Sequence, residues 1–204
     1  MLEHMDSPLP IVEVSNPITL FRQWYDEAIS KEPDVPNAMS LATANSDGKP
    51  SVRMVLMKEV SERGFVFYTN TESRKSAELE NNRFASLCFH WKSMKRQVRI
   101  EGSVVFVNAA DADAYHASRP RQSQLAAWAS RQSHVLDRRE TLLSRFKEME
   151  PRFEGNVVPR SQTWNGYCLM PMVLEFWQDV RDRLHDRLIY TRHKEGWGIK
   201  RLYP

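Results

Sequence analysis

The strongest constraint on the fold is the way in which apolar segments rich in β-branched and aromatic residues alternate with short turns. Two such pairs are evident: "NSDGK" separates 38–44 from 50–60, and "KSMK" separates 84–91 from 96–107. Apolar runs joined by so few residues are typical of β-hairpins, in which neighbouring strands are antiparallel. We expect about eight strands, over residues 38–44, 50–60, 65–70, 84–91, 96–107, 166–178, 183–193 and 197–204.

Helices are expected in separate groups and not between successive strands. Asn16 can cap a helix whose first turn begins at Pro17 and whose apolar stripe includes Leu20, Phe21 and Trp24. The absence of strand–helix–strand alternation argues against a parallel doubly wound sheet. The fold class that fits is mainly β with accessory helices, an antiparallel barrel that is closed or partly closed. Further helices are predicted within residues 72–82, 109–119, 121–133 and 137–153.

Length and composition favour a single globular domain without a metal site. The chain has 204 residues, and we assign 16–204 to one domain and 1–15 to a flexible segment that starts with the tag-like "MLEHM". No signal pattern or long apolar run is evident, so we expect a cytoplasmic protein without a membrane span. Cys88 and Cys168 lie in apolar runs and are expected to be free core thiols. The net charge of +3 permits anionic ligands but does not indicate nucleic-acid binding.

Phosphate binding, if it occurs, must rely on side chains, because neither GxGxxG nor GxxxxGK[ST] occurs in the sequence. Arg74 and Lys75 stand at a helix start, where cations are unfavourable unless an anion binds there. By strand parity, Arg53 and Lys58 fall on opposite faces. Solvated charge, or stacking of Tyr115 on an arginine four residues later, also explains single clusters. Together, these clusters indicate two anion-binding subsites.

The stretch "WQDVRDRLHDRL" carries three basic side chains at alternate positions, Arg183, His185 and Arg187. If this stretch is part of a strand, alternation places all three on one face. Like charges side by side on a strand are unfavourable unless an anion lies against them. We therefore predict that an anionic ligand binds at this face.

Several motifs resemble the pyridoxamine 5′-phosphate oxidase family, in the family's order and spacing from about residue 16 to 204. They are "RMVLMK", "FYTNTESRKSAELENN", "RQVRIEG", "SRPRQSQLAAWASRQS", "WNGY" and "EFWQ" followed by "RLHDR". The resemblance implies an FMN-binding split β-barrel that forms a homodimer, with FMN at the subunit interface. It also implies oxidation of pyridoxamine or pyridoxine 5′-phosphate to pyridoxal 5′-phosphate, with hydride transfer from C4′ to flavin N5 and reduction of O2 to hydrogen peroxide.

The resemblance also implies residue roles. Arg183 and His185 would lie over the substrate ring as the catalytic pair, and Lys58, Tyr115, Arg119 and Ser123 would hold the substrate phosphate. FMN would be bound by Arg53, Met54, Val55, Leu56, Met57, Lys58, Tyr68, Thr69, Arg74, Lys75, Gln97, Gln132, Ser133, Trp177 and Arg187.

Two departures from the family pattern concern the substrate side. The segment before Asn16 lacks the Arg and Tyr that cover the substrate in the family, and Asp179 replaces the glycine that usually follows "EFWQ". If that position needs a positive φ, Asp179 introduces strain and alters kinetics or substrate range. Two alternatives are another split-barrel flavoprotein, such as a flavin reductase-like or haem-degrading protein, and a carrier that binds FMN or pyridoxal phosphate without turnover.

Overall fold

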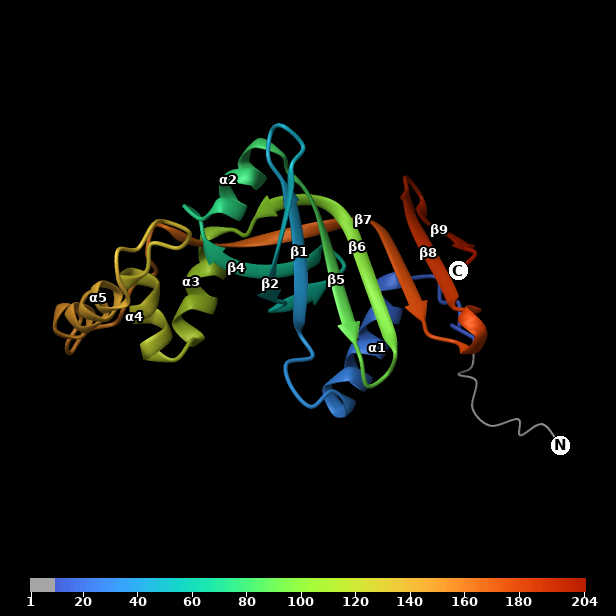
Figure 1. The fold of residues 1–204 in the computed structure, drawn as a ribbon, viewed down its shortest axis with the longest axis horizontal. Helices are drawn as coiled ribbons and strands as arrows, with labels where there is room; N and C mark the ends of the chain where they lie inside the picture. Colours follow the sequence, from blue (N-terminus) through green and yellow to red (C-terminus); the bar gives the residue numbers. More distant parts are fainter. Residues whose placement is uncertain (1–9) are drawn as a thin grey trace.

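The fold is built on one antiparallel sheet, in a computed structural model that describes residues 10–204. The strands follow the order β2-β1-β5-β6-β7-β4-β3, with β8 added to β7 and β9 to β8. The sheet curls into a partly closed barrel (Figure 1), which confirms the predicted fold class. The strands are β1 Ala38–Ala44, β2 Pro50–Leu56, β3 Glu59–Ser61, β4 Gly64–Asn70, β5 Phe84–Trp91, β6 Arg96–Phe106, β7 Trp164–Gln178, β8 Asp186–His193 and β9 Gly196–Arg201.

The strand predicted over 50–60 is two strands in the structure. β2 ends at Leu56, and Met57 turns into the core, where it is 4% exposed. Lys58 then donates its backbone N–H to Val66 of β4, and β3 begins at Glu59. The break carries the chain from the β1–β2 hairpin to the β3–β4 hairpin. The described residues therefore contain nine strands, one more than expected.

Strand β7 connects the two ends of the molecule. Its first half pairs with β4 and its second half with β8, while β6 runs along both. The β6–β7 register shifts between Glu101 and Gly102. A Cβ on Gly102 would lie 2.0 Å from the carbonyl oxygen of Met170, so this bulge needs a glycine. The bulge lets one long strand serve both the barrel and the β8–β9 extension.

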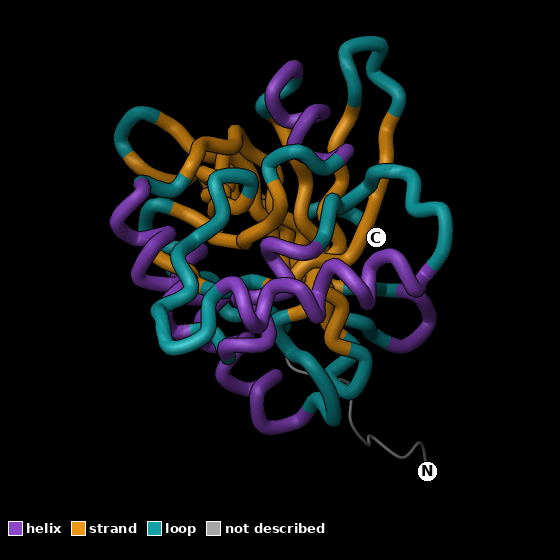
Figure 2. Tube along the Cα trace, turned by 90° about the vertical axis from the view of Figure 1, so that its left-hand side faces the viewer, coloured by secondary structure: helices purple, strands orange, loops and turns teal. Residues whose placement is uncertain are grey.

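The part of the chain that the structure describes also contains five α-helices. In Figure 1, α3–α5 gather at one end of the molecule and β8–β9 lie at the other, while Figure 2 shows the helical end in front of the strands. Asn16 accepts a hydrogen bond from Ile18 N at 2.8 Å, as predicted for the cap of the first helix. The helices are α1 Pro17–Lys31, α2 Arg74–Asn81, α3 Ala109–Ser118, α4 Arg121–Ala129 and α5 Arg139–Arg152.

The main core fills the barrel and is closed by α1. Phe21 of α1 makes edge-to-face contacts with Phe65 and Phe89, at centroid distances of 4.8 and 5.0 Å. A separate cluster around Leu125 and Phe153 holds α4 against α5. The helical end is therefore stabilised by its own small apolar core. The polar loops between it and the barrel are not needed for that core and can line a binding site. The two cysteines are free, as predicted.

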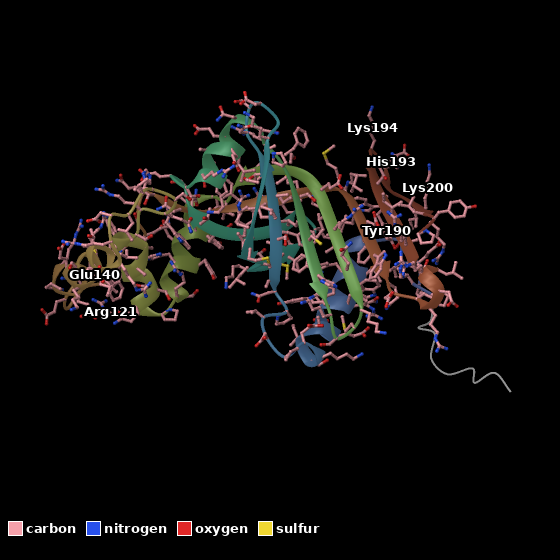
Figure 3. All side chains as sticks on the ribbon, in the orientation of Figure 1. Arg121, Glu140, Tyr190, His193, Lys194 and Lys200 are labelled. Atoms are coloured by element: carbon pink, nitrogen blue, oxygen red, sulfur yellow. The ribbon has the colours of Figure 1, made fainter. Side chains whose placement is uncertain are left out.

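The chain before α1 packs against the C-terminal strands. Ile11 is 5% exposed, and its N–H donates to Asp186 at 2.7 Å. The hydroxyl of Tyr190, labelled in Figure 3, donates to the carbonyl oxygen of Val14 at 2.9 Å. Part of the segment assigned outside the domain thus contacts it, whereas the tag-like residues lie outside the described 10–204. In that described range, no helix combines the length and apolarity needed to cross a bilayer.

Candidate functional site

A polar cleft of about 540 Å³ opens between β2, β4, the start of α2 and the loop after α4. It brings together segments that are far apart in sequence. Most residues predicted to contact the flavin line it, but Met57, Gln97, Trp177 and Arg187 do not. The lining residues are Ser51, Val52, Arg53, Met54, Val55, Leu56, Lys58, Tyr68, Thr69, Arg74, Lys75, Gln132 and Ser133.

Lys75 is a buried cation at the centre of this cleft. The side chain is 6% exposed, and its ammonium donates to Thr69 Oγ1 at 2.9 Å, Ser73 Oγ at 3.0 Å and Gln132 Oε1 at 2.9 Å. All three acceptors are neutral, and within residues 10–204 no carboxylate pairs with the ammonium. Burial, reinforced by the charge of Arg53, lowers the pKa of Lys75 from 10.5 to about 8. The first turn of α2 is therefore prepared to receive an anion.

Glu78 fixes the two arginines that flank Lys75. Its carboxylate pairs with Arg53 at 3.2 Å and with Arg74 at 2.8 Å. Burial raises the pKa of Glu78, but hydrogen bonds from Ser51, Thr43 and Arg74 and the charge of Arg53 outweigh it and bring the pKa to about 2. The cleft therefore keeps four cationic side chains, Arg53, Lys58, Arg74 and Lys75, against one carboxylate.

An aromatic stack extends the cleft toward α3. The ring of Tyr68 is nearly parallel to those of Tyr115 and Trp164, at centroid distances of 4.1 and 4.9 Å, and the latter two rings are 6.1 Å apart. The guanidinium of Arg119 lies 4.8 Å from the centroid of Trp164, and its Nη1 is buried without a hydrogen-bond partner among residues 10–204. A hollow of about 230 Å³ lies beside it and shares Tyr68 with the main cleft. An unpaired buried donor is unfavourable, and an anion in this hollow would give Nη1 of Arg119 a partner.

Ser123 lies in the first turn of α4, close in sequence to Arg119, but it lines neither hollow. Its backbone N–H donates to Pro120 O at 2.8 Å. The structure thus gathers Lys58 into the main cleft and Arg119 into its extension, and it leaves Ser123 outside the lining of both.

A second group of predicted residues lies on β6, β7 and β8, outside the lining of the main cleft. Gln97 of β6, Trp177 of β7 and Arg187 of β8 are register partners and form one row across three strands. Arg187 donates to Glu175 Oε1 at 2.9 Å, and the ring of His185 lies 4.7 Å from that of Trp177. None of these residues lines the main cleft. Within one chain, the predicted cofactor residues therefore form two groups.

The interpretation of Arg183, His185 and Arg187 as alternate residues of one strand is wrong. Strand β8 begins at Asp186, so only Arg187 belongs to it. Residues 181–183 form a short 3₁₀ turn in which Asp182 and Arg183 have φ of 58° and 61°. Arg183 and His185 are placed by this turn and not by strand alternation. The left-handed positions are Asp182 and Arg183, so the strain considered for Asp179 does not occur at that residue.

Sequence reasoning missed the side chains that hold the arginines in place. Glu78 could have been found, because it stands four residues after Arg74 on one helix face. Glu175 is 4% exposed and pairs with both Arg99 and Arg187. The signal for Glu175 is a single carboxylate inside the apolar run "MVLEFW", because a charge buried in a strand needs a partner.

The family follows from comparison with known proteins. The sequence model described as "Pyridoxamine 5′-phosphate oxidase" matches residues 25–153, more than half of the chain. The chain belongs to the pyridoxamine 5′-phosphate oxidase family. A second model, "Pyridoxine 5′-phosphate oxidase C-terminal dimerisation region", matches residues 164–204. The resemblance drawn from the motifs is thereby confirmed.

Curated members of the pyridoxamine 5′-phosphate oxidase family are similar over nearly the whole chain. The pyridoxine/pyridoxamine 5′-phosphate oxidase of Gluconobacter oxydans is 51% identical over 199 residues, which cover 97% of this chain and 100% of that protein. The protein of the same name from Sphingopyxis alaskensis is 53% identical over 189 residues, covering 93% and 88%. Both comparisons cover more than nine-tenths of this chain.

Solved structures show the same fold. PhzG from Burkholderia lata, in complex with tetrahydrophenazine-1-carboxylic acid, superposes with a TM-score of 0.91 at 34% identity and covers 98% of both chains. A pyridoxamine 5′-phosphate oxidase-related, FMN-binding protein from Nostoc punctiforme gives a TM-score of 0.73 at 15% identity, covering 90% of this chain and 97% of that one. The second likeness shows the fold alone.

Proposed function

We propose that this chain is an FMN-dependent oxidase that converts pyridoxamine 5′-phosphate or pyridoxine 5′-phosphate to pyridoxal 5′-phosphate. The observation that carries the proposal is a pair of basic groups, in two adjoining hollows, that have no anionic partner among the described residues. One is the buried ammonium of Lys75, and the other is the guanidinium of Arg119 with its unpartnered Nη1. Two phosphorylated molecules, a cofactor and a substrate, match these two groups. The names of the curated relatives support this substrate class.

The residues around Lys75 fit the phosphate of FMN. Arg53 from β2 and Arg74 from the start of α2 would donate to it, where the helix dipole also favours an anion. Lys75 would contribute its charge, because its three N–H groups already have acceptors. Thr69 and Gln132 already converge on the Lys75 ammonium and would line the same end. Bound FMN would supply the hydride-accepting chemistry and return the electrons to O2.

The residues around Arg119 fit the phosphate of the substrate. Arg119 would donate its free Nη1, with Lys58 and Tyr115 closing the subsite and Ser123 following in the first turn of α4. The phenol of Tyr68 stays neutral, since burial, with nearby acidic groups, raises its pKa to about 12. A phosphate fixed at this end would hold the reacting carbon at a constant depth in the cleft. Arg183 and His185 would orient and polarise the substrate ring.

We further propose that the site is shared between two subunits. Lys75 and the row Gln97–Trp177–Arg187 belong to different parts of the chain, which Figure 1 shows as α2 and the β6–β8 region. The edge strand β2 presents Val52 and Met54, 67% and 62% exposed, beside the cleft. An exposed apolar strand edge favours cover by another chain. The row of one subunit would then complete the cleft of its partner, with FMN at the interface.

Complementation tests the shared site. Lys75→Met disables the cleft and Arg187→Ala disables the row, so each homodimer is inactive in both sites. In an unfolded and refolded equal mixture, half of the dimers are mixed, and one of their two sites is intact, which restores about a quarter of full activity. No recovery above either variant alone, with mixed dimers verified by mass, would contradict the shared site.

Product analysis tests the reaction itself. The FMN-loaded protein, given pyridoxamine 5′-phosphate in air, should form pyridoxal 5′-phosphate and hydrogen peroxide in equal amounts. Arg119→Gln should weaken the reaction, while Arg139→Gln, at an exposed position on α5, should not. A protein that binds FMN but releases no peroxide would be a carrier and not an oxidase. Turnover of tetrahydrophenazine-1-carboxylic acid in place of the phosphorylated amines would also contradict the proposal.

A further inference from the structure

Asp179 lies in the chain between Trp177, the β7 member of the row Gln97–Trp177–Arg187, and the turn that carries Arg183. It directly follows β7, which ends at Gln178, and its backbone N–H donates to the carbonyl oxygen of Lys95 at 2.9 Å. One carboxylate oxygen, Oδ2, lies 3.9 Å from the ammonium of Lys95 in the β5–β6 turn. The backbone of Asp179 is therefore anchored to a neighbouring turn, and its side chain is held in place on one side.

The other carboxylate oxygen faces His185. Oδ1 of Asp179 lies 3.0 Å from Nδ1 of His185, and the ring of His185 leans on Trp177 at a centroid distance of 4.7 Å and an interplanar angle of 45°. Both side chains are partly buried, at 36% and 23% exposure. The imidazole is thus held by a carboxylate at Nδ1 and by an indole along its face. Within residues 10–204, its Nε2 makes no hydrogen bond.

The protonation of Nδ1 follows from its two neighbours. The backbone N–H of Val180 also approaches Nδ1, at 3.2 Å, and would need an unprotonated nitrogen. The carboxylate of Asp179 needs a protonated one, because an oxygen anion facing a lone pair at 3.0 Å is repelled. The approach of the carboxylate to Nδ1 is closer than that of the Val180 N–H and carries a full charge, so it decides the protonation of Nδ1. Val180 is partly exposed, and water can satisfy its N–H.

We propose that Asp179 is a positioning residue that fixes His185 as the Nδ1–H tautomer and in one ring orientation. The inference rests on the proposed function, in which His185 lies over the substrate ring. With Nδ1 occupied by Asp179, the neutral imidazole presents Nε2 as a hydrogen-bond acceptor for the amine or hydroxyl group of the substrate. An imidazole without such a partner would present either nitrogen. The residue that departs from the family pattern would therefore specify which nitrogen meets the substrate.

The tautomer can be measured without turnover. In ¹⁵N NMR spectra of the ring nitrogens, recorded at a pH where the imidazole is neutral, the wild-type His185 should show mainly Nδ1–H. Asp179→Gly removes the acceptor and should shift the population toward Nε2–H, and Asp179→Asn should give an intermediate population. The matched control is Asp182→Asn, three residues away, which keeps Asp179 and suits the left-handed backbone at φ 58°. A wild-type His185 that is mainly Nε2–H would overturn the inference.

Kinetics connect the tautomer to the reaction. Asp179→Gly should lower kcat by about threefold to tenfold, the range expected for one hydrogen bond. The KM for pyridoxamine 5′-phosphate should change little, because Arg119 still holds the phosphate. Asp182→Asn should leave both constants unchanged. A tautomer shift with unaltered kcat would overturn the positioning role alone, whereas a wild-type protein without turnover would overturn the proposed function.

Discussion

Replacing Lys75 with methionine removes a buried cation while keeping a long side chain. The pKa of Lys75 falls from 10.5 to about 8 on folding, chiefly through burial. At about 1.4 kcal/mol per pH unit, the protonated amine opposes folding by up to about 3 kcal/mol. This penalty is fully present below pH 8 and disappears as the pH rises to 10.5, because the unfolded chain then still binds a proton that the folded chain has lost.

The substitution also removes the three hydrogen bonds of the ammonium to Thr69, Ser73 and Gln132. At about 1 kcal/mol each, they offset the relief from the buried charge near pH 7. We therefore expect wild type and Lys75→Met to unfold with free energies within about 1 kcal/mol of each other at pH 7. At pH 10, the wild type should be more stable by about 3 kcal/mol.

Urea unfolding of the FMN-free protein, in phosphate-free buffer from pH 7 to 10, measures this difference. Lys147→Met is the control, because Lys147 is exposed on α5 and its substitution should give a difference that does not vary with pH. FMN binding supplies a second readout: wild-type affinity should fall above about pH 8 as Lys75 deprotonates, and the affinity of Lys75→Met should be low throughout. A stability difference for Lys75→Met that is constant from pH 7 to 10 would refute the account of Lys75.

Three further substitutions test separate parts of the structure. Arg119→Gln should raise the KM for pyridoxamine 5′-phosphate by about tenfold to a hundredfold, as expected for a charged hydrogen bond, and an unchanged KM in steady-state assays would remove Arg119 from the subsite. Glu78→Gln should reduce the free energy of unfolding by up to about 3 kcal/mol at pH 7. Burial opposes the charge, but hydrogen bonds hold the folded pKa of Glu78 near 2, so its contribution is present above pH 4.5 and lost as the pH falls toward 2; equal losses in urea at pH 7 and pH 3 would contradict this. Gly64→Ala places a Cβ 2.0 Å from a backbone oxygen at φ +145° and should destabilise by more than about 2 kcal/mol in thermal unfolding, well beyond Gly155→Ala, where φ is +68° and the space is open.

The strand pattern and turns predicted the antiparallel barrel well, because hairpins are local. The turn "NSDGK" between 38–44 and 50–60 specifies the β1–β2 pair without information from the rest of the chain. The prediction from strand alternation was wrong where a strand ended earlier than expected. Arg53 and Lys58 were assigned to opposite faces, but β2 stops at Leu56 and both side chains line one cleft. The polar and apolar pattern alone does not show where a strand breaks.

The strand predicted to include residues 183–187 was wrong for a related reason. Its alternating basic residues imitate a strand, yet Asp182 and Arg183 adopt left-handed backbone conformations that no local signal requires of an arginine. The pairing of Arg99 with Glu175 was equally out of reach, since 76 positions separate them and only the β6–β7 register brings them together. Motifs shared with the family predicted most residues that line the cleft. The carboxylates that hold the arginines leave a signal in the sequence, but their partners across strands emerged only from the folded structure.

The most direct test of the central claim is an anaerobic visible spectrum of the FMN-loaded protein before and after addition of pyridoxamine 5′-phosphate. If two phosphorylated molecules occupy the two subsites and hydride passes between them, the yellow flavin band bleaches on addition and returns when air is admitted. Pyridoxamine without its phosphate, at the same concentration, should bleach the band far more slowly, because the Arg119 subsite is then empty. A flavin band that stays unchanged with the phosphorylated amine would contradict the assignment of this chain as an oxidase.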